Sequence, residues 1–383
     1  MFCNFSASFE QKNEVTRLSP LVTFNITTFD QTDKKRKGLS FSAFFCYTNE
    51  CAFALYQMIL LGALKVDFFS NLLAALPGAV AQGLIWGLMA IGVYITFKVL
   101  DLADLTVDGT MATGGAVCIV LMTNGVNVWV ALLCAFLAGM LAGLITGVLH
   151  TFMGIPAILA GILTQLALFS INLRIMGKKA NMAINPDNYD LLVSLRNVKK
   201  VTLENPIFVA AVFGIIVIAV LYWFFGTSLG CSIRATGANP NMSRAQGINV
   251  DFNKVLGLMI SNGIVALSSA LYCQYQGFAD VNAGRGAIVI GLAAVIIGEV
   301  LFSRIFRNFA LKLLSVALGA VIYYIVIQLV LTLGLDTNDL KLITAAVVAI
   351  FLAIPYWKGK YFKGAGKAIA KASADAKGGE DNA

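Results

Sequence analysis

Long apolar runs, which become regular from Pro77 onward, constrain this chain more than any other feature of its sequence. Several of them exceed the ~20 apolar residues that an α-helix needs to cross a bilayer. The chain is 58% hydrophobic and only 13% charged, whereas soluble domains are about 45–50% apolar and about 25% charged. The runs therefore predict an all-α fold, a polytopic bundle of membrane-spanning helices.

The apolar runs divide into about nine spans. We expect them at about 77–98, 108–123, 128–153, 156–173, 206–225, 253–273, 286–303, 309–335 and 340–357. Pro77 fits the first turn of the first span, where a missing N–H costs nothing. This gives three parts: an N-terminal extension (1–76), a transmembrane domain (77–357) and a tail (358–383). The tail begins with lysine and aromatic residues and is mostly Ala, Gly, Lys, Asp and Glu from Gly364, a composition typical of disorder.

The N-terminal extension fits no pattern well. A basic cluster at 34–37 precedes a broken apolar stretch at 39–64, whose clean part, 51–64, is short for a span. The stretch could be a signal-like or anchoring segment, although no small-residue cleavage site stands out. Alternatively, Met58 is the true start of the protein. Mass spectrometry of the native N-terminus distinguishes these hypotheses, because peptides upstream of Met58 would contradict the second.

The short loops predict the orientation, since cytoplasmic loops carry an excess of Lys and Arg. If the first span starts outside, the inward residues are Lys98, His150, Arg234, Arg244, Lys254, Arg304, Arg307, Lys312 and the lysines of the tail. The short outward connections hold Asp280 with Arg285, and Asp336 with Asp339. The long connection 174–205 is also basic, but long loops are weak indicators of orientation. The basic cluster at 34–37 would also lie outside, unless 39–64 adds a crossing or the protein starts later.

Several classes of site have no signature in the sequence. The seven cysteines are scattered without metal-ligand spacing and are typical of small apolar packing residues. There is one histidine, His150, at the end of a span, where it more often marks an interface. Neither a metalloprotease helix motif nor a P-loop is present, so we expect no metal site, no catalytic set and no ATP bound through a P-loop of this chain. The net charge of +8 lies in loops and tails, which does not indicate nucleic-acid binding.

One polar island, Gly230 to Val250, separates two apolar runs and carries two arginines and no acid. Within it, Asn239 can cap a helix that Pro240 begins, and Gly247 can end that helix in a left-handed conformation. Asp251 or Asn253 can then cap the next span. A short helix between two spans could fit a groove on a soluble partner and transmit its movement; the alternative is an ordinary basic loop with a capped turn.

Acidic residues near the membrane give a second candidate site. Asp101, Asp104 and Asp108 would share one face if their segment is helical. They could line a gate or an inner vestibule, with a polar line continuing through Thr106, Thr110 and Thr113. Alternatively they form a solvated turn in which Asp108 caps the second span.

Two further features lie within the spans. Glu299 could pair with Arg304 or Arg307, or it could serve a pathway or an interface between subunits. Gly139, Gly143 and Gly147 form a smooth stripe at four-residue spacing on the third span. The stripe favours close packing within the subunit over a dimer contact.

Three stretches resemble the permeases of ABC importers of the branched-chain amino acid and ribose type. The first is the polar island, at Gly230, Arg234, Ala235, Gly237, Asn239, Pro240, Ala245, Gly247 and Ile248; the others are Gln82–Ala116 and Gly277–Phe302. The stretches come in the order expected for that family, and the likeness runs from about 77 to 357. It is closest to a subgroup of mostly unassigned substrate, some members of which are linked to aromatic amino acids. The first 70 or so residues have no counterpart in the family.

The resemblance implies a permease of the bacterial inner membrane that works as a pair and imports a small solute, such as an amino acid. A separate ABC ATPase subunit would hold ATP and Mg, and an extracytoplasmic binding protein would supply the substrate. The coupling residues would be Arg234, Ala235, Gly237, Asn239, Pro240, Arg244 and Gly247, with Arg234 and Arg244 contacting the ATPase or fixing the loop. An ion- or proton-coupled carrier is the alternative, with Asp101, Asp104, Asp108 and Glu299 as its ion sites. A membrane-embedded enzyme is disfavoured because the chain offers no nucleophile or metal set.

Overall fold

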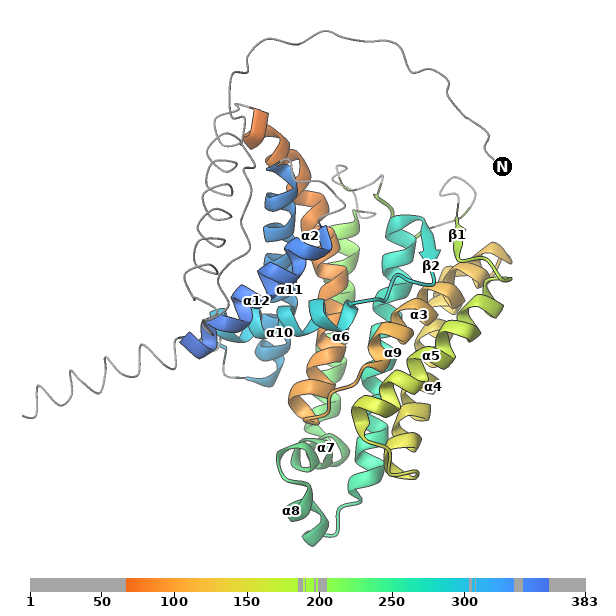
Figure 1. Ribbon diagram of the computed structural model, residues 1–383, viewed down its shortest axis with the longest axis vertical. Helices are drawn as coiled ribbons and strands as arrows, with labels where there is room; N and C mark the ends of the chain where they lie inside the picture. The colour runs from red at the N-terminus through yellow and green to blue at the C-terminus, as the bar shows by residue number, and fades with distance from the viewer. Residues whose placement is uncertain are drawn as a thin grey trace, which may run out of the picture. The chain divides into compact units, whose positions relative to one another are not determined.

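The computed structural model describes residues 67–184, 189, 191–195, 198, 205–302, 305–306, 308–333 and 340–357. These residues form a bundle of helices with one pair of short strands (Figure 1). The elements are α2 (Asp67–Tyr94), the π-helix η1 (Ile95–Val99), α3 (Thr106–Thr123), α4 (Val128–Thr151), α5 (Ala157–Ile175), β1 (Asn181–Ala183), α6 (Pro206–Gly226), α7 (Ser228–Ala238), α8 (Pro240–Ala245), α9 (Val250–Gln276), β2 (Phe278–Asp280), α10 (Ala287–Phe302), α11 (Phe309–Thr332) and α12 (Leu340–Trp357).

A helix is present at each of the nine positions where the sequence predicts a span. Within the described part of the chain, seven helices are long and apolar enough to cross a membrane, with α2 and η1 counted together from Asn71 to Val99. The helix α10 is apolar but shorter than a full span, and α12 is not among the seven. The all-α membrane bundle is confirmed, and seven is the number of crossings that length and composition support directly.

The start of the first span differs from the prediction. The helix α2 begins at Asp67, so Pro77 lies inside it and not in its first turn. The helix therefore runs across the boundary expected between residues 76 and 77. A proline inside a membrane helix is tolerated because neighbouring helices satisfy the backbone groups that it frees. The basic cluster 34–37, the apolar stretch 39–64, Met58 and the tail 358–383 lie outside the described residues.

The helix α9 lies at the centre of the packing and contacts α2, α3 and α4. Its apolar residues are interrupted by buried serines whose hydroxyls donate to main-chain carbonyls of the neighbouring helices. Ser261 and Ser268 bond the carbonyls of Gly92 and Ile85 on α2, each at 2.7 Å. Ser269 bonds the carbonyl of Met111 on α3. Such hydrogen bonds hold membrane helices together where apolar burial gives no net driving force.

The glycine stripe of α4 faces the same helix. A Cβ atom at Gly139 or Gly143 would collide with the main chain of α9, at Asn262 and Leu258 respectively, and one at Gly147 would lie 3.0 Å from the Cα of Val255. The two backbones can therefore approach closely only because these positions lack side chains. The contact lies within one subunit.

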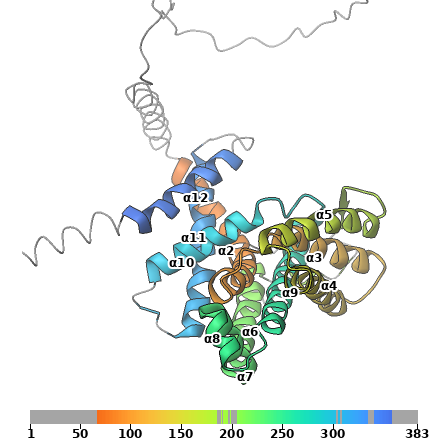
Figure 2. The same cartoon turned by 60° about the horizontal axis from the view of Figure 1, so that its bottom comes forward.

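The two ends of the bundle are built differently. At one end β1 and β2 pair antiparallel, with Asn181 opposite Asp280, and join the segment after α5 to the segment after α9. At the other end α7 and α8 extend beyond α6 and α9 (Figures 1 and 2). The polar island of the sequence is therefore a separate structural element at one end of the bundle.

A single methyl group tests the close approach of α4 to α9. We expect Gly143→Ala to lower the free energy of unfolding by about 1–3 kcal/mol, the usual cost of overpacking a core. The matched control is Gly214→Ala on α6, where a Cβ atom meets nothing within 4 Å. Thermal unfolding of the two purified variants in detergent measures the difference. Equal midpoints would contradict the packing argument.

Candidate functional site: the α7–α8 element

The helix α7 was not expected from the sequence, which predicted a loop before Asn239. Thr227 caps it by accepting a hydrogen bond from the Gly230 N–H at 3.4 Å. Its buried face consists of Gly230, Ile233 and Thr236, spaced three apart. That spacing after a capping threonine is the signal that could have revealed the helix.

The helix α8 has the ends that the sequence predicts. The Asn239 side chain accepts hydrogen bonds from the N–H groups of Asn241 and Met242, each at 3.1 Å. Pro240 occupies the first turn, and Gly247 has φ +79° just after the helix. Ser243 is its buried residue, whereas the Met242 side chain is 60% exposed. The helix therefore presents most of its surface outward.

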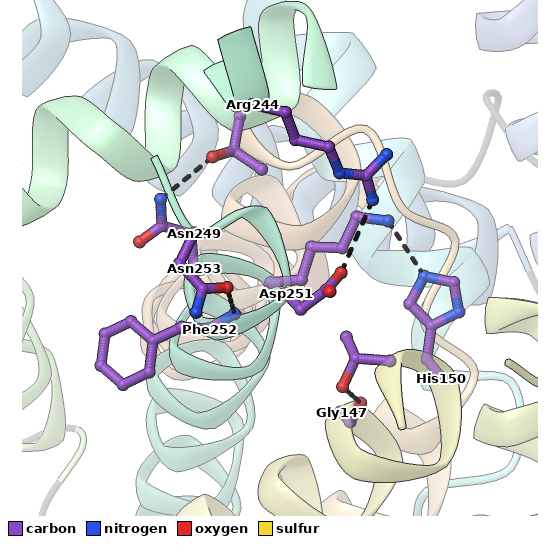
Figure 3. Close-up of polar contacts among 10 residues, drawn as sticks. Gly147, His150, Arg244, Asn249, Asp251, Phe252 and Asn253 are labelled. Atoms are coloured by element: carbon purple, nitrogen blue, oxygen red, sulfur yellow. Dashed lines mark hydrogen bonds and ion pairs between the residues drawn. The ribbon is translucent and has the colours of Figure 1, made fainter. Parts of the chain in front are cut away.

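Arg244 extends from α8 toward the start of α9 (Figure 3). Its guanidinium lies 3.7 Å from the carboxylate of Asp251, and both side chains are 58% exposed. An exposed pair of this kind contributes little to stability, so Arg244 is available to a partner. The sequence suggested Asp251 or Asn253 as the cap of α9. The cap is instead Asn249, whose side chain accepts a hydrogen bond from the Phe252 N–H at 3.1 Å.

Two contacts fix α7 to the bundle. The Asn253 amide donates to the Thr236 hydroxyl at 3.1 Å and ties α7 to α9 (Figure 3). Gly237 packs so closely against the main chain of Val99 and Leu100 that a side chain there would collide with it. Thus Gly237 places α7 against the end of the first span, and Ala235 lies half-buried on the same helix.

The surroundings of the Arg234 side chain differ from those of the Arg244 side chain. Its guanidinium lies over the Phe309 ring, 5.2 Å from the centroid, at a cleft between the end of α6, α7 and the start of α11. The two arginines, grouped by the sequence in one coupling set, therefore face different surroundings. Of the two, Arg244 is the one carried by α8.

His150 joins α4 to α9 beside this element. Its Nε2 lies 3.2 Å from the Lys254 ammonium (Figure 3). Its Nδ1 lies 2.9 Å from the Ile155 carbonyl oxygen. An ammonium can only donate and a carbonyl can only accept, so both contacts are satisfied when Nε2 accepts and Nδ1 donates. The interface that His150 marks is the junction of two helices of one subunit.

The three aspartates do not share a helical face. Residues 101–104 are not helical, and α3 begins only at Thr106. Asp101 is exposed with φ 55°. Asp108 does not cap α3; its carboxylate accepts from the N–H groups of Gly286 and Ile288, at 3.0 and 2.9 Å, at the start of α10.

Asp104 and Thr110 meet at one buried amide. The Asn262 side chain donates to the Asp104 carboxylate at 2.7 Å and accepts from the Thr110 hydroxyl at 2.8 Å. Asp104 also accepts from the Thr106 N–H at 2.9 Å. Burial raises the pKa of the Asp104 carboxyl, and these hydrogen bonds lower it in part. The arrangement fastens the α2–α3 connection to α9.

The remaining predicted polar residues also make structural contacts. Thr113 donates to the Gly109 carbonyl of its own helix at 2.9 Å. Glu299 pairs with Lys98 at 3.0 Å, a partner far away in the sequence, whereas Arg304 and Arg307 lie outside the described residues. Among the residues that the structure describes, no cluster of His, Cys, Asp or Glu could hold a metal ion.

The sequence profile of the family described as the permease component of branched-chain amino acid transport systems matches residues 75–353. The chain belongs to that family. It is therefore a multi-pass permease subunit of an ATP-driven importer in the bacterial inner membrane.

Several curated relatives cover most of the transmembrane domain. A tyrosine transport system permease protein of Clostridioides difficile is 41% identical over 281 residues, which are 73% of this chain and 91% of the relative. An uncharacterized protein of Rickettsia prowazekii is 34% identical over 72% of this chain and 95% of its own. The ribose import permease protein of Escherichia coli is 24% identical over 64% of this chain and 74% of its own. No solved structure matches.

The cap of α8 can be tested directly. We expect Asn239→Ala to cost about 1 kcal/mol of helix stability, because two main-chain N–H groups lose their acceptor. Hydrogen exchange of the 241–246 amides should become several-fold faster, as this energy implies. Asn249→Ala is the control: it should affect the start of α9 and leave exchange in α8 unchanged. Unchanged exchange in Asn239→Ala would show that α8 does not depend on its cap.

The buried carboxyl of Asp104 predicts a pH dependence. Its pKa is raised in the folded protein above the ordinary value of 3.8. Protonation therefore favours folding, and its contribution is full below the ordinary pKa and is lost as pH rises through the raised one. We expect the difference in unfolding midpoint between the wild type and Asp104→Asn to change as pH rises from about 4 toward 7. The midpoint of the wild type should fall relative to that of the variant. A constant difference would show that Asp104 does not titrate in this range.

Proposed function

We propose that this permease imports an amino acid, with tyrosine or a similar aromatic amino acid as the first candidate. The proposal rests on the relative from Clostridioides difficile, which is 41% identical, whereas the ribose permease is 24% identical. A separate binding protein would deliver the substrate outside the cell. The protein would work as a homodimer and would hold no cofactor itself, because ATP and Mg would bind the partner ATPase.

The α7–α8 element would be the place where the ATPase acts, on the cytoplasmic side. The observation that carries this proposal is the form of α8: a capped helix of six residues, Pro240–Ala245, that is mostly exposed and lies between α7 and the spanning helix α9. Closure of the ATPase subunits would displace α8, and α7 would pass that movement to the spans. Nucleotide binding by the partner would supply the energy, so this chain only transmits it.

The carboxylates give no support to an ion-coupled mechanism. Asp104, Asp108 and Glu299 are each engaged by neighbouring groups in the described part of the chain. Asp101 is exposed at a turn. None of the four forms a shared site with another, so their arrangement suits helix packing better than ion binding.

Replacement of Arg244 tests the coupling role. We expect Arg244→Glu to abolish uptake and to weaken binding of the ATPase, while the fold persists because the Asp251 pair is exposed. The exchange Arg244→Asp with Asp251→Arg restores an internal ion pair of opposite polarity. If Arg244 served only that pair, the double variant would regain uptake. We expect it to remain inactive, whereas Asp251→Asn should transport normally.

Substrate identity is tested with the partner ATPase and the partner binding protein. Reconstituted together in liposomes, they should drive ATP-dependent uptake of labelled tyrosine, and excess phenylalanine should compete more strongly than ribose. Competition by ribose alone would overturn the amino acid proposal. Uptake that follows a proton or sodium gradient without ATP would contradict the importer mechanism.

A further inference from the structure

The cleft beside Arg234 has no part in the function described so far. Its volume is about 440 Å³, and it is lined by Tyr222, Trp223, Phe225, Gly226, Thr227, Arg234 and Phe309. It lies where α6 ends at Gly226 and where α11 begins at Phe309. Because both helices are long and apolar enough to span a membrane, the cleft lies at the border between hydrocarbon and water.

The side chains of the cleft are typical of that border. Trp223 is 71% exposed and Tyr222 is 56% exposed, and their amphipathic rings suit the level of lipid headgroups. A molecule that entered the cleft would therefore meet both aromatic surface and the guanidinium of Arg234.

The cleft attracts negative charge. In the described part of the chain, the Arg234 guanidinium lies over the Phe309 ring, and no carboxylate lies within ion-pair distance of it. Glu299 on α10 is already neutralised by Lys98 at 3.0 Å. The first turn of α11 adds to the effect, because Asn308 gives it no side-chain cap and free N–H groups at a helix start favour anions.

We propose that this cleft binds the phosphate headgroup of an anionic membrane phospholipid. Arg234 and the first turn of α11 hold the phosphate, and Trp223 and Tyr222 pack against the glycerol and the upper acyl chains. Since Arg234 belongs to α7, a bound lipid fixes the helix that leads directly into α8. The membrane itself thereby becomes a partner of the coupling element.

Fluorescence quenching by brominated lipid tests the proposal on the full-length protein in nanodiscs. Two preparations contain equal amounts of phosphatidylglycerol and phosphatidylcholine, with bromine on one lipid or on the other. The signal of Trp223 is isolated by subtracting the Trp223→Phe protein. We expect about a fivefold enrichment of phosphatidylglycerol at Trp223, as follows from the ~1 kcal/mol that one basic residue gives toward anionic lipid.

Matched variants assign the effect to the cleft. The enrichment should disappear in Arg234→Gln, persist in Arg234→Lys, and persist in Arg244→Gln, whose arginine lies on α8. In the wild type it should also be lost at about 1 M salt, where the screening length falls to about 3 Å. This last measurement does not use the Arg234→Gln variant and so holds even if that variant fails to fold.

Three outcomes would overturn the proposal. One is equal quenching by the two lipids in the wild type at low salt. Another is an enrichment that Arg234→Gln retains. The third is a Trp223 signal that neither lipid quenches, because a second copy of the chain would then cover the cleft.

Discussion

The close contact of α4 with α9 is the constraint on which the rest of the bundle depends. Three glycines remove the side chains that would hold the two backbones apart. Serine hydroxyls of α9 then bind carbonyls of α2 and α3 from its other faces. In lipid, where apolar surface gains nothing by burial against other helices, small residues and interhelical hydrogen bonds are the available means of association. The polar residues within the spans are therefore explained first by assembly.

This packing also determines what the candidate site can do. Because α9 is fixed along its length, its first residues provide firm positions for Asn253 and Lys254, which bind α7 and the end of α4. The α2–α3 connection is held to α9 through Asp104 and Asn262. An isolated six-residue helix would not be stable in water. Here α8 keeps its shape and position because its supports are part of the membrane core.

The features that the sequence predicted well depend on local chemistry. Asn239, Pro240 and Gly247 specify the two ends of α8 through capping and backbone preference, which neighbouring residues alone determine. The glycine spacing on α4 likewise identifies a smooth face, although it does not identify the helix that packs there. The spans follow from apolar length, and their predicted ends are accurate to a few residues. The exception is α2, which begins at Asp67 and not at Pro77.

What the sequence could not predict depends on contacts between distant residues. Glu299 finds Lys98, and Asp108 reaches the start of α10, across long separations that no spacing rule covers. The three aspartates would share one face only in a helical segment, and the chain instead makes a non-helical turn with Asp101 at φ 55°. The family resemblance places Arg234 and Arg244 in one coupling set, and only the presence of α7 shows that their surroundings differ.

The attachment of α7 has a mechanical consequence. At Gly237 the helix packs against the end of the first span. At Thr236 it is hydrogen-bonded to Asn253 at the beginning of α9. It is thus a bracket with two anchors in different parts of the bundle. A load applied at α8 reaches both anchors in a single displacement, so the strain is shared between two helices instead of bending one of them.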